Sequence, residues 1–196
     1  MKKRFVLLVT VSAFLGLFFE IFQHSVNENS LFEGLKLFRY FTVQSNFIVF
    51  GYFLLIVLFP KIDQNKYHAF FGGVQIYIFI TMSVFFIFLE RIYNPTGLSL
   101  IGSIFSHYIT PLLVITFFVL NREDYDFKIK HLLLWITYPL IYLLFAIVHG
   151  FITDDFLYPF FQVSEIGILG LIVSILSLIS LFTVLSFLLV KIVSKE

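Results

Sequence analysis

The sequence has no cysteine and few charged residues, and these two shortages exclude several classes of protein. Without cysteine the chain forms no disulfide, binds no metal through thiolates and has no cysteine nucleophile. Only 13% of its 196 residues are charged, about half the share of a soluble domain. The formal net charge is +1 and no basic cluster runs along the chain, so we expect no nucleic-acid partner.

Apolar residues are present in excess. They make up 60% of the chain, Phe alone accounts for 29 positions, and the mean hydropathy is +0.99. No soluble fold of this length buries so much apolar surface. Because only helices and closed barrels satisfy their backbone groups in lipid, we expect an all-α, multi-pass protein of the cell membrane, surrounded by membrane lipids.

Six apolar segments have about the 20 residues needed to cross a bilayer. The first follows Met1-Lys2-Lys3-Arg4, and its length and the lack of a clear cleavage site favour an uncleaved helix over a signal peptide. The short connections favour one six-helix domain covering residues 1–196. The predicted spans are 5–23, 40–59, 69–90, 98–120, 131–152 and 163–190.

Lys and Arg residues gather on one side of these spans. Ten of the 13 lie in the N-terminus, the C-terminus and the 61–68 and 121–130 loops. Loops rich in Lys and Arg stay in the cytoplasm. We therefore expect cytoplasmic N- and C-termini, with the 24–39, 91–98 and 153–162 loops outside.

The stretch from Arg39 to Asn46 opens the second span with polar residues. Thr42, Ser45 and Asn46 stand at helical spacing (i, i+3, i+4) and share one face. Polar side chains in a membrane helix are costly when they face lipid. We therefore expect this face to contact protein or a water-filled cavity.

Every predicted span places a polar or ionisable side chain in its outer half, whereas most inner halves are almost purely apolar. Such residues inside a membrane suggest function by default. Each also has a structural interpretation, since the Glu residues lie near the interface and Tyr residues often anchor there. For His107 the structural alternative is that it satisfies a carbonyl freed by Pro111. Besides Thr42 and Asn46 in the second span, the residues are Glu20, Glu90, His107, Tyr142, His149 and Glu165.

Thr42 and His107 lie at similar depth and form a possible nucleophile and base. A threonine hydroxyl attacks at neutral pH only when a base removes its proton, and a neutral histidine does so. Gln44, Ser45 and Asn46 would orient the pair or donate to an oxyanion, and Glu20, Glu90, Tyr142 and His149 would line the pocket. The same set offers zinc ligands or a proton relay, but no ligand spacing or inverted repeat supports either. We expect no metal and no cofactor.

Three stretches resemble a known family: Arg39 to Asn46, Ser106 to Leu112, and Tyr138 to Phe161. In span number and motif order the chain resembles the bacterial six-span family called Pr-six-Pr. That family is distantly similar to the eukaryotic androgen-induced and androgen-dependent membrane proteins. Those relatives are intramembrane hydrolases that cleave fatty acid esters of hydroxy fatty acids with a Thr and a His. The resemblance matches these two residues to Thr42 and His107.

The resulting hypothesis is a hydrolase of lipid acyl esters with a pocket open to the outer leaflet. Thr42 would form an acyl-enzyme with help from His107, and water would hydrolyse it. The alternative is a protein without catalytic activity, either a binder of a lipid or small molecule or a structural partner. Under that alternative Thr42, Ser45 and Asn46 hydrogen-bond to neighbouring helices and hold them together.

Overall fold

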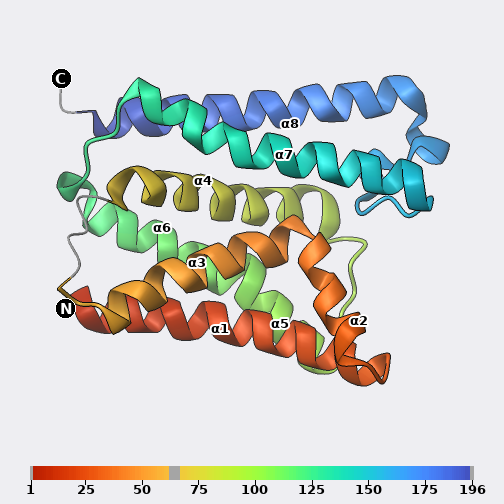
Figure 1. Cartoon of the computed structure of the whole chain (residues 1–196), viewed down its shortest axis with the longest axis horizontal. Helices are drawn as coiled ribbons and strands as arrows, with labels where there is room; N and C mark the ends of the chain where they lie inside the picture. Colours follow the sequence, from red (N-terminus) through yellow and green to blue (C-terminus); the bar gives the residue numbers. More distant parts are fainter. Residues whose placement is uncertain (1, 62–66, 195–196) are drawn as a thin grey trace. The chain divides into compact units, whose positions relative to one another are not determined.

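The computed structural model describes residues 2–61 and 67–194, and Figure 1 shows its helices. Within these residues every regular element is a helix. Six helices are long and apolar enough to cross a membrane, and a helix satisfies most of its backbone groups within itself, as lipid requires. The chain is therefore an integral membrane protein of the all-α class, as predicted.

The spans begin and end within a few residues of their predicted bounds. Two of them contain a turn of π-helix, in which each N–H bonds the carbonyl five residues back. The spans are α1 (Lys2–Asn27), α3 (Phe41–Leu58), α4 (His68–Val84) continued by the π-turn η3 (Phe85–Leu89), α5 (Gly97–Ile104) continued by the π-turn η4 (Phe105–Ile109) and α6 (Thr110–Leu120), α7 (Ile129–Thr153) and α8 (Val163–Val193).

The chain groups into two compact units, one through Asp124 and one from Tyr125, and each is described by itself. The first unit contains α1 to α6 and the 3₁₀ turn η5 (Arg122–Asp124). The second contains α7, α8 and the 3₁₀ turn η6 (Pro159–Phe161). Whether the whole chain is one domain stays a prediction.

In the first unit α1 packs along both α3 and α5, as Figure 1 shows. Two glycines bring α1 and the α5–η4 segment close together. A Cβ at Gly102 would stand 2.8 Å from the backbone nitrogen of Glu20, and one at Gly16 would stand 2.7 Å from Ser106 Oγ. Small residues permit such close approach between membrane helices.

Aromatic rings fill the interior between α3, α4 and α6. Phe53, Phe71 and Phe117 contact one another edge to face, with ring centroids 5.2 to 6.0 Å apart. Edge-to-face packing is a favoured geometry for aromatic pairs. This cluster fixes one end of the helices that carry the polar residues at the other end.

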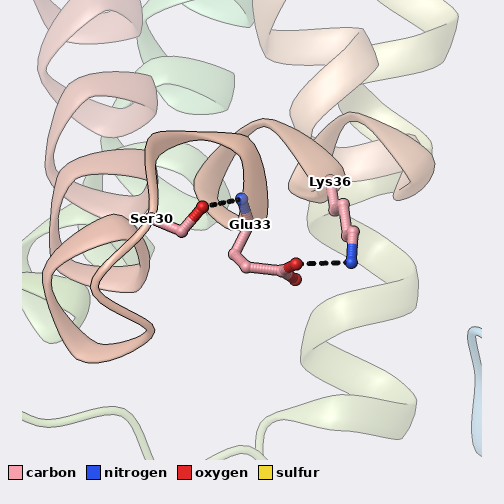
Figure 2. Close-up of polar contacts among 3 residues, drawn as sticks. All are labelled: Ser30, Glu33 and Lys36. Carbon is pink, nitrogen blue, oxygen red and sulfur yellow. Dashed lines mark hydrogen bonds and ion pairs between the residues drawn. The ribbon is translucent and has the colours of Figure 1, made fainter.

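A short helical segment connects α1 to α3. It consists of α2 (Leu31–Leu35) and the 3₁₀ turn η1 (Lys36–Arg39). Figure 2 shows Ser30 capping α2 by accepting from the Glu33 N–H at 3.4 Å, while Lys36 Nζ contacts Glu33 at 2.6 Å. Gly34 lies directly against Ser25, so α2 folds back onto α1 and delivers the chain to the start of α3.

The second unit is built from α7 and α8 packed side by side (Figure 1). Helix α8 is interrupted near its start by Gly167, whose φ of 68° and ψ of 172° suit glycine alone. Helix α7 continues through Pro139.

Two residues used to predict the orientation of the termini, Lys66 and Lys195, lie outside the described residues, and the orientation stays a prediction.

Candidate functional site

The π-turn η4 contains His107 and leaves one backbone carbonyl without a helical donor. The Thr110 N–H bonds the Phe105 carbonyl, five residues back, and so bypasses Ser106. In the same register the Ser106 carbonyl would accept from residue 111, which is proline and has no N–H. Sequence and helix register together therefore free the Ser106 carbonyl inside the membrane.

Asn46 on α3 supplies the missing donor. Its Nδ2 donates to the Ser106 carbonyl at 3.1 Å and to the Thr42 carbonyl, one turn back on its own helix, at 2.9 Å. Both bonds share one nitrogen, so the two carbonyl oxygens lie within two hydrogen-bond lengths of each other. Asn46 thus joins the start of α3, which carries Thr42, to the turn that carries His107.

The His107 ring is held on two sides. Its Nδ1 lies 3.0 Å from the Ser103 carbonyl and 3.1 Å from Ser103 Oγ, and its plane stacks on Phe85 with ring centroids 3.7 Å apart. Because a carbonyl only accepts, Nδ1 carries the proton of the neutral ring, and Nε2 is the basic nitrogen. The structural alternative for His107 does not hold in that form, because Asn46 bonds the Ser106 carbonyl and the His107 ring contacts Ser103.

Thr42 lies in the first turn of α3 and is half-buried. Its carbonyl accepts from Asn46 and also from Ser45 Oγ at 3.0 Å. Among the described residues its hydroxyl forms no hydrogen bond. The hydroxyl that we expected to act as a nucleophile is therefore not held by another side chain of this part of the chain.

The polar neighbours of Thr42 make structural contacts. Ser45 Oγ lies 2.7 Å from Thr81 Oγ1 on α4, and Gln44 Nε2 donates to the Phe38 carbonyl at 2.7 Å. Both N–H groups of the Asn46 amide are used by two carbonyls. Asn46 therefore positions the two segments and has no N–H left for an oxyanion.

Besides the Asn46 bond to Ser106, three side-chain bonds connect the helices of this unit. Ser12 Oγ on α1 lies 2.7 Å from Thr110 Oγ1 on α6, and Gln75 Nε2 on α4 donates to the Val114 carbonyl at 3.4 Å. Ser45 and Thr81 form the third bond, between α3 and α4. The polar face predicted for the second span thus belongs to a wider set of contacts between helices.

Glu20 points from α1 toward the turn that carries His107. It is buried, with 8% of its surface exposed, and its Cγ lies against Gly102. The Ser106 hydroxyl approaches its carboxyl group without meeting the geometry of a hydrogen bond. Tyr93, in the loop after η3, lies close enough to Glu20 for the charge of its carboxyl group to change the Tyr93 pKa. Burial, together with the smaller effects of the charges on Glu20 and Tyr40, raises the pKa of Tyr93 to about 12.

Glu90 ends the η3 turn and is exposed. Its carboxylate accepts a hydrogen bond from Tyr108 Oη at 2.5 Å. Tyr108 follows His107 in η4, and its ring contacts Phe85 edge to face. Glu90 is therefore joined to the His107 turn through Tyr108, at the rim of the site.

Tyr142 and His149 lie in the second unit, and each has a partner there. Tyr142 Oη is 3.4 Å from Tyr158 Oη, and His149 Nδ1 contacts the Asp155 carbonyl at 3.0 Å. The histidine holds the turn after α7, where Asp154 has a φ of 57°. Their predicted role in lining a pocket with Thr42 stays a prediction.

Across the described residues, no three His, Asp or Glu side chains are grouped as metal ligands.

Two residues of the site were missed from the sequence alone. Phe85 lies in an apolar run, and nothing in that run distinguishes the ring that stacks on His107 from its neighbours. Ser106 precedes His107, and its role depends on the π register. The only sequence signal for that role was Pro111, which removes an N–H from the turn.

Comparison with known proteins gave no match: no family model, no curated protein and no solved structure is detectably similar to this chain. The resemblance to the bacterial six-span family therefore stays a prediction.

Proposed function

We propose that this membrane protein hydrolyses acyl esters of lipids, with Thr42 as nucleophile and His107 as base. The observation that carries the proposal is the contact of His107 Nδ1 with the Ser103 carbonyl at 3.0 Å. Since Nδ1 donates to the Ser103 carbonyl, Nε2 presents a lone pair, as a general base requires. Asn46 holds the Thr42 backbone close to that of Ser106, the neighbour of His107.

The proposed reaction has two steps. In the first, His107 Nε2 takes the Thr42 hydroxyl proton as the oxygen attacks the ester carbonyl carbon, and the departing alcohol receives that proton. In the second, a water molecule attacks the acyl-Thr42 ester and gives its proton to Nε2. The fatty acid leaves, and the proton returns to the Thr42 oxygen.

The test is labelling of the purified protein with a fluorophosphonate probe, with the labelled residue mapped by mass spectrometry. We expect label on Thr42, and we expect its loss in both Thr42→Ala and His107→Ala. Ser45→Ala is the matched control, because Ser45 is a buried hydroxyl on the same helix already bonded to Thr81. It should still label. A folded wild type that takes no label, or label on another residue, would exclude the proposed nucleophile.

A second candidate function is favoured by a specific observation. Side chains of Ser12, Ser45, Asn46 and Gln75 each bond a neighbouring helix. In this alternative the polar residues hold the helices together around a site that binds a lipid or small molecule without chemistry. It predicts that Thr42→Ala and His107→Ala change the thermal stability or ligand binding, while the wild type shows no labelling.

A further inference from the structure

Three buried oxygen atoms near the His107 turn have no hydrogen-bond partner among the described residues. They are Glu20 Oε1, Asn46 Oδ1 and Ser106 Oγ. Ser106 and Asn46 are fully buried, and Glu20 is 8% exposed. A buried polar atom without a partner costs about 1–3 kcal/mol. Three such atoms in one part of a membrane protein therefore indicate a ligand that bonds to them.

Ser106 connects the three residues in space. Asn46 bonds the Ser106 carbonyl, and the Glu20 carboxyl group approaches the Ser106 hydroxyl. The side chain of Ser106 lies opposite Gly16, where a Cβ would stand 2.7 Å from its oxygen. Because glycine has no side chain, α1 approaches Ser106 closely here without a methyl group in contact with its hydroxyl.

The orientation of the Asn46 amide is fixed by its neighbours. Its nitrogen contacts two carbonyl oxygens, which only accept hydrogen bonds, so the atom there must be the NH₂ group. The unpaired atom is therefore the carbonyl oxygen Oδ1, an acceptor. Glu20 Oε1 is a second acceptor, and the Ser106 hydroxyl supplies a single proton.

The chemistry of these atoms selects the ligand. An ester carbonyl or another group that only accepts hydrogen bonds would leave both acceptors unpaired. A hard divalent cation is held mainly by carboxylates, and a single carboxylate beside a neutral amide and a hydroxyl would leave an uncompensated positive charge inside the membrane. A water molecule donates two protons and accepts one, and buried waters make about three hydrogen bonds to otherwise unpaired groups.

We propose that Glu20, Asn46 and Ser106 bind an ordered water molecule between α1, α3 and η4. The water donates to Glu20 Oε1 and Asn46 Oδ1 and accepts from the Ser106 hydroxyl. It links three helices and hydrates the turn that carries His107. The site stands independently of the proposed hydrolase, since it rests on buried atoms that the proposed reaction does not use.

The test is X-ray radiolytic footprinting of the full chain in lipid nanodiscs. Radiolysis converts a bound water into a hydroxyl radical in place, so a buried water oxidises the side chains around it. We expect oxidation of Phe105 and His107, which flank Ser106, to fall several-fold in Gly16→Ala, whose added methyl group occupies the space beside Ser106 Oγ. Phe71, fully buried elsewhere in the same unit, should be oxidised slowly throughout.

Two further variants keep the outcome interpretable. Gly51→Ala is the matched control, because a Cβ at Gly51 meets no atom within 4 Å, and it should oxidise like wild type. Glu20→Met removes one acceptor at similar length and should also lower oxidation, even where Gly16→Ala fails to fold. Equal oxidation of Phe105 and His107 in wild type, Gly16→Ala and Glu20→Met would overturn the water site.

Discussion

Asn46 shows how much of the site depends on one side chain. From one nitrogen it donates to carbonyls on two helices, and one of these carbonyls has lost its helical donor to the π register and Pro111. In this register no backbone group makes this bond, because the Thr110 N–H bonds the Phe105 carbonyl and residue 111 is proline. The contact between the Thr42 segment and the His107 turn therefore depends on this amide.

We expect Asn46→Leu to lower the free energy of unfolding by about 1–3 kcal/mol, the cost of a buried carbonyl left without its donor. Unfolding in mixed detergent micelles, followed by circular dichroism, measures this change. Asn121→Leu is the control, because Asn121 Nδ2 bonds only the Phe117 carbonyl of its own helix and is partly exposed. Equal losses in the two variants would contradict the bridging role.

Among single residues, the sequence located the polar side chains of the spans better than it predicted their partners. Polar side chains in an apolar segment are conspicuous, so Thr42, Asn46, His107 and Glu20 were found by type and depth. Their partners depend on helix register, which hydropathy does not encode. The stacking of Phe85 on His107 could not be predicted from the sequence, for the same reason.

Among the elements, the α1–α5 crossing sets how closely the polar residues of the first unit approach one another. The helices meet where Gly102 faces Glu20. A Cβ at Gly102 would also stand 3.1 Å from the Gly16 carbonyl oxygen. A larger residue there meets the Glu20 side chain, which can move, and also the backbone of α1 at Glu20 and Gly16, which cannot move without separating the helices. The crossing therefore requires glycine for steric reasons.

Gly102→Ala should destabilise the protein by about 1–3 kcal/mol, the range for overpacking a close contact. Gly51→Ala, in the middle of α3 with open space around it, should be neutral or slightly stabilising because alanine favours helix. Thermal unfolding of both variants beside wild type gives the comparison. If Gly102→Ala were as stable as Gly51→Ala, the two helices would be able to separate without cost.

The six spans were predicted closely because length and hydropathy suffice to place an apolar helix in a bilayer. The short α2 segment and the two π-turns were not. Helix α2 has five residues and depends on its cap and on the fold-back against α1. The π-turns insert one residue without changing composition, so no hydropathy window detects them.

For the whole molecule, the placement of Lys and Arg predicts both termini in the cytoplasm. The absence of native cysteine makes this directly measurable, since any introduced cysteine is the only one. In intact cells an impermeant maleimide should label Glu28→Cys and Asn94→Cys, both on exposed residues between spans.

Glu123→Cys, exposed after α6, should be labelled only after the membrane is opened. The reverse pattern would invert the orientation and place the Thr42 end of α3 at the cytoplasmic leaflet. Equal labelling of all three positions in intact cells would indicate mixed orientations.

The π-turn at Phe105–Ile109 also affects how this chain should be compared with others. Such a turn absorbs one extra residue while the helix before and after it keeps its facing. A protein of the same architecture with a regular α-helix here would be one residue shorter between Ser103 and Pro111. Alignments should therefore permit a single gap inside this membrane span, where insertions and deletions are usually penalised most heavily.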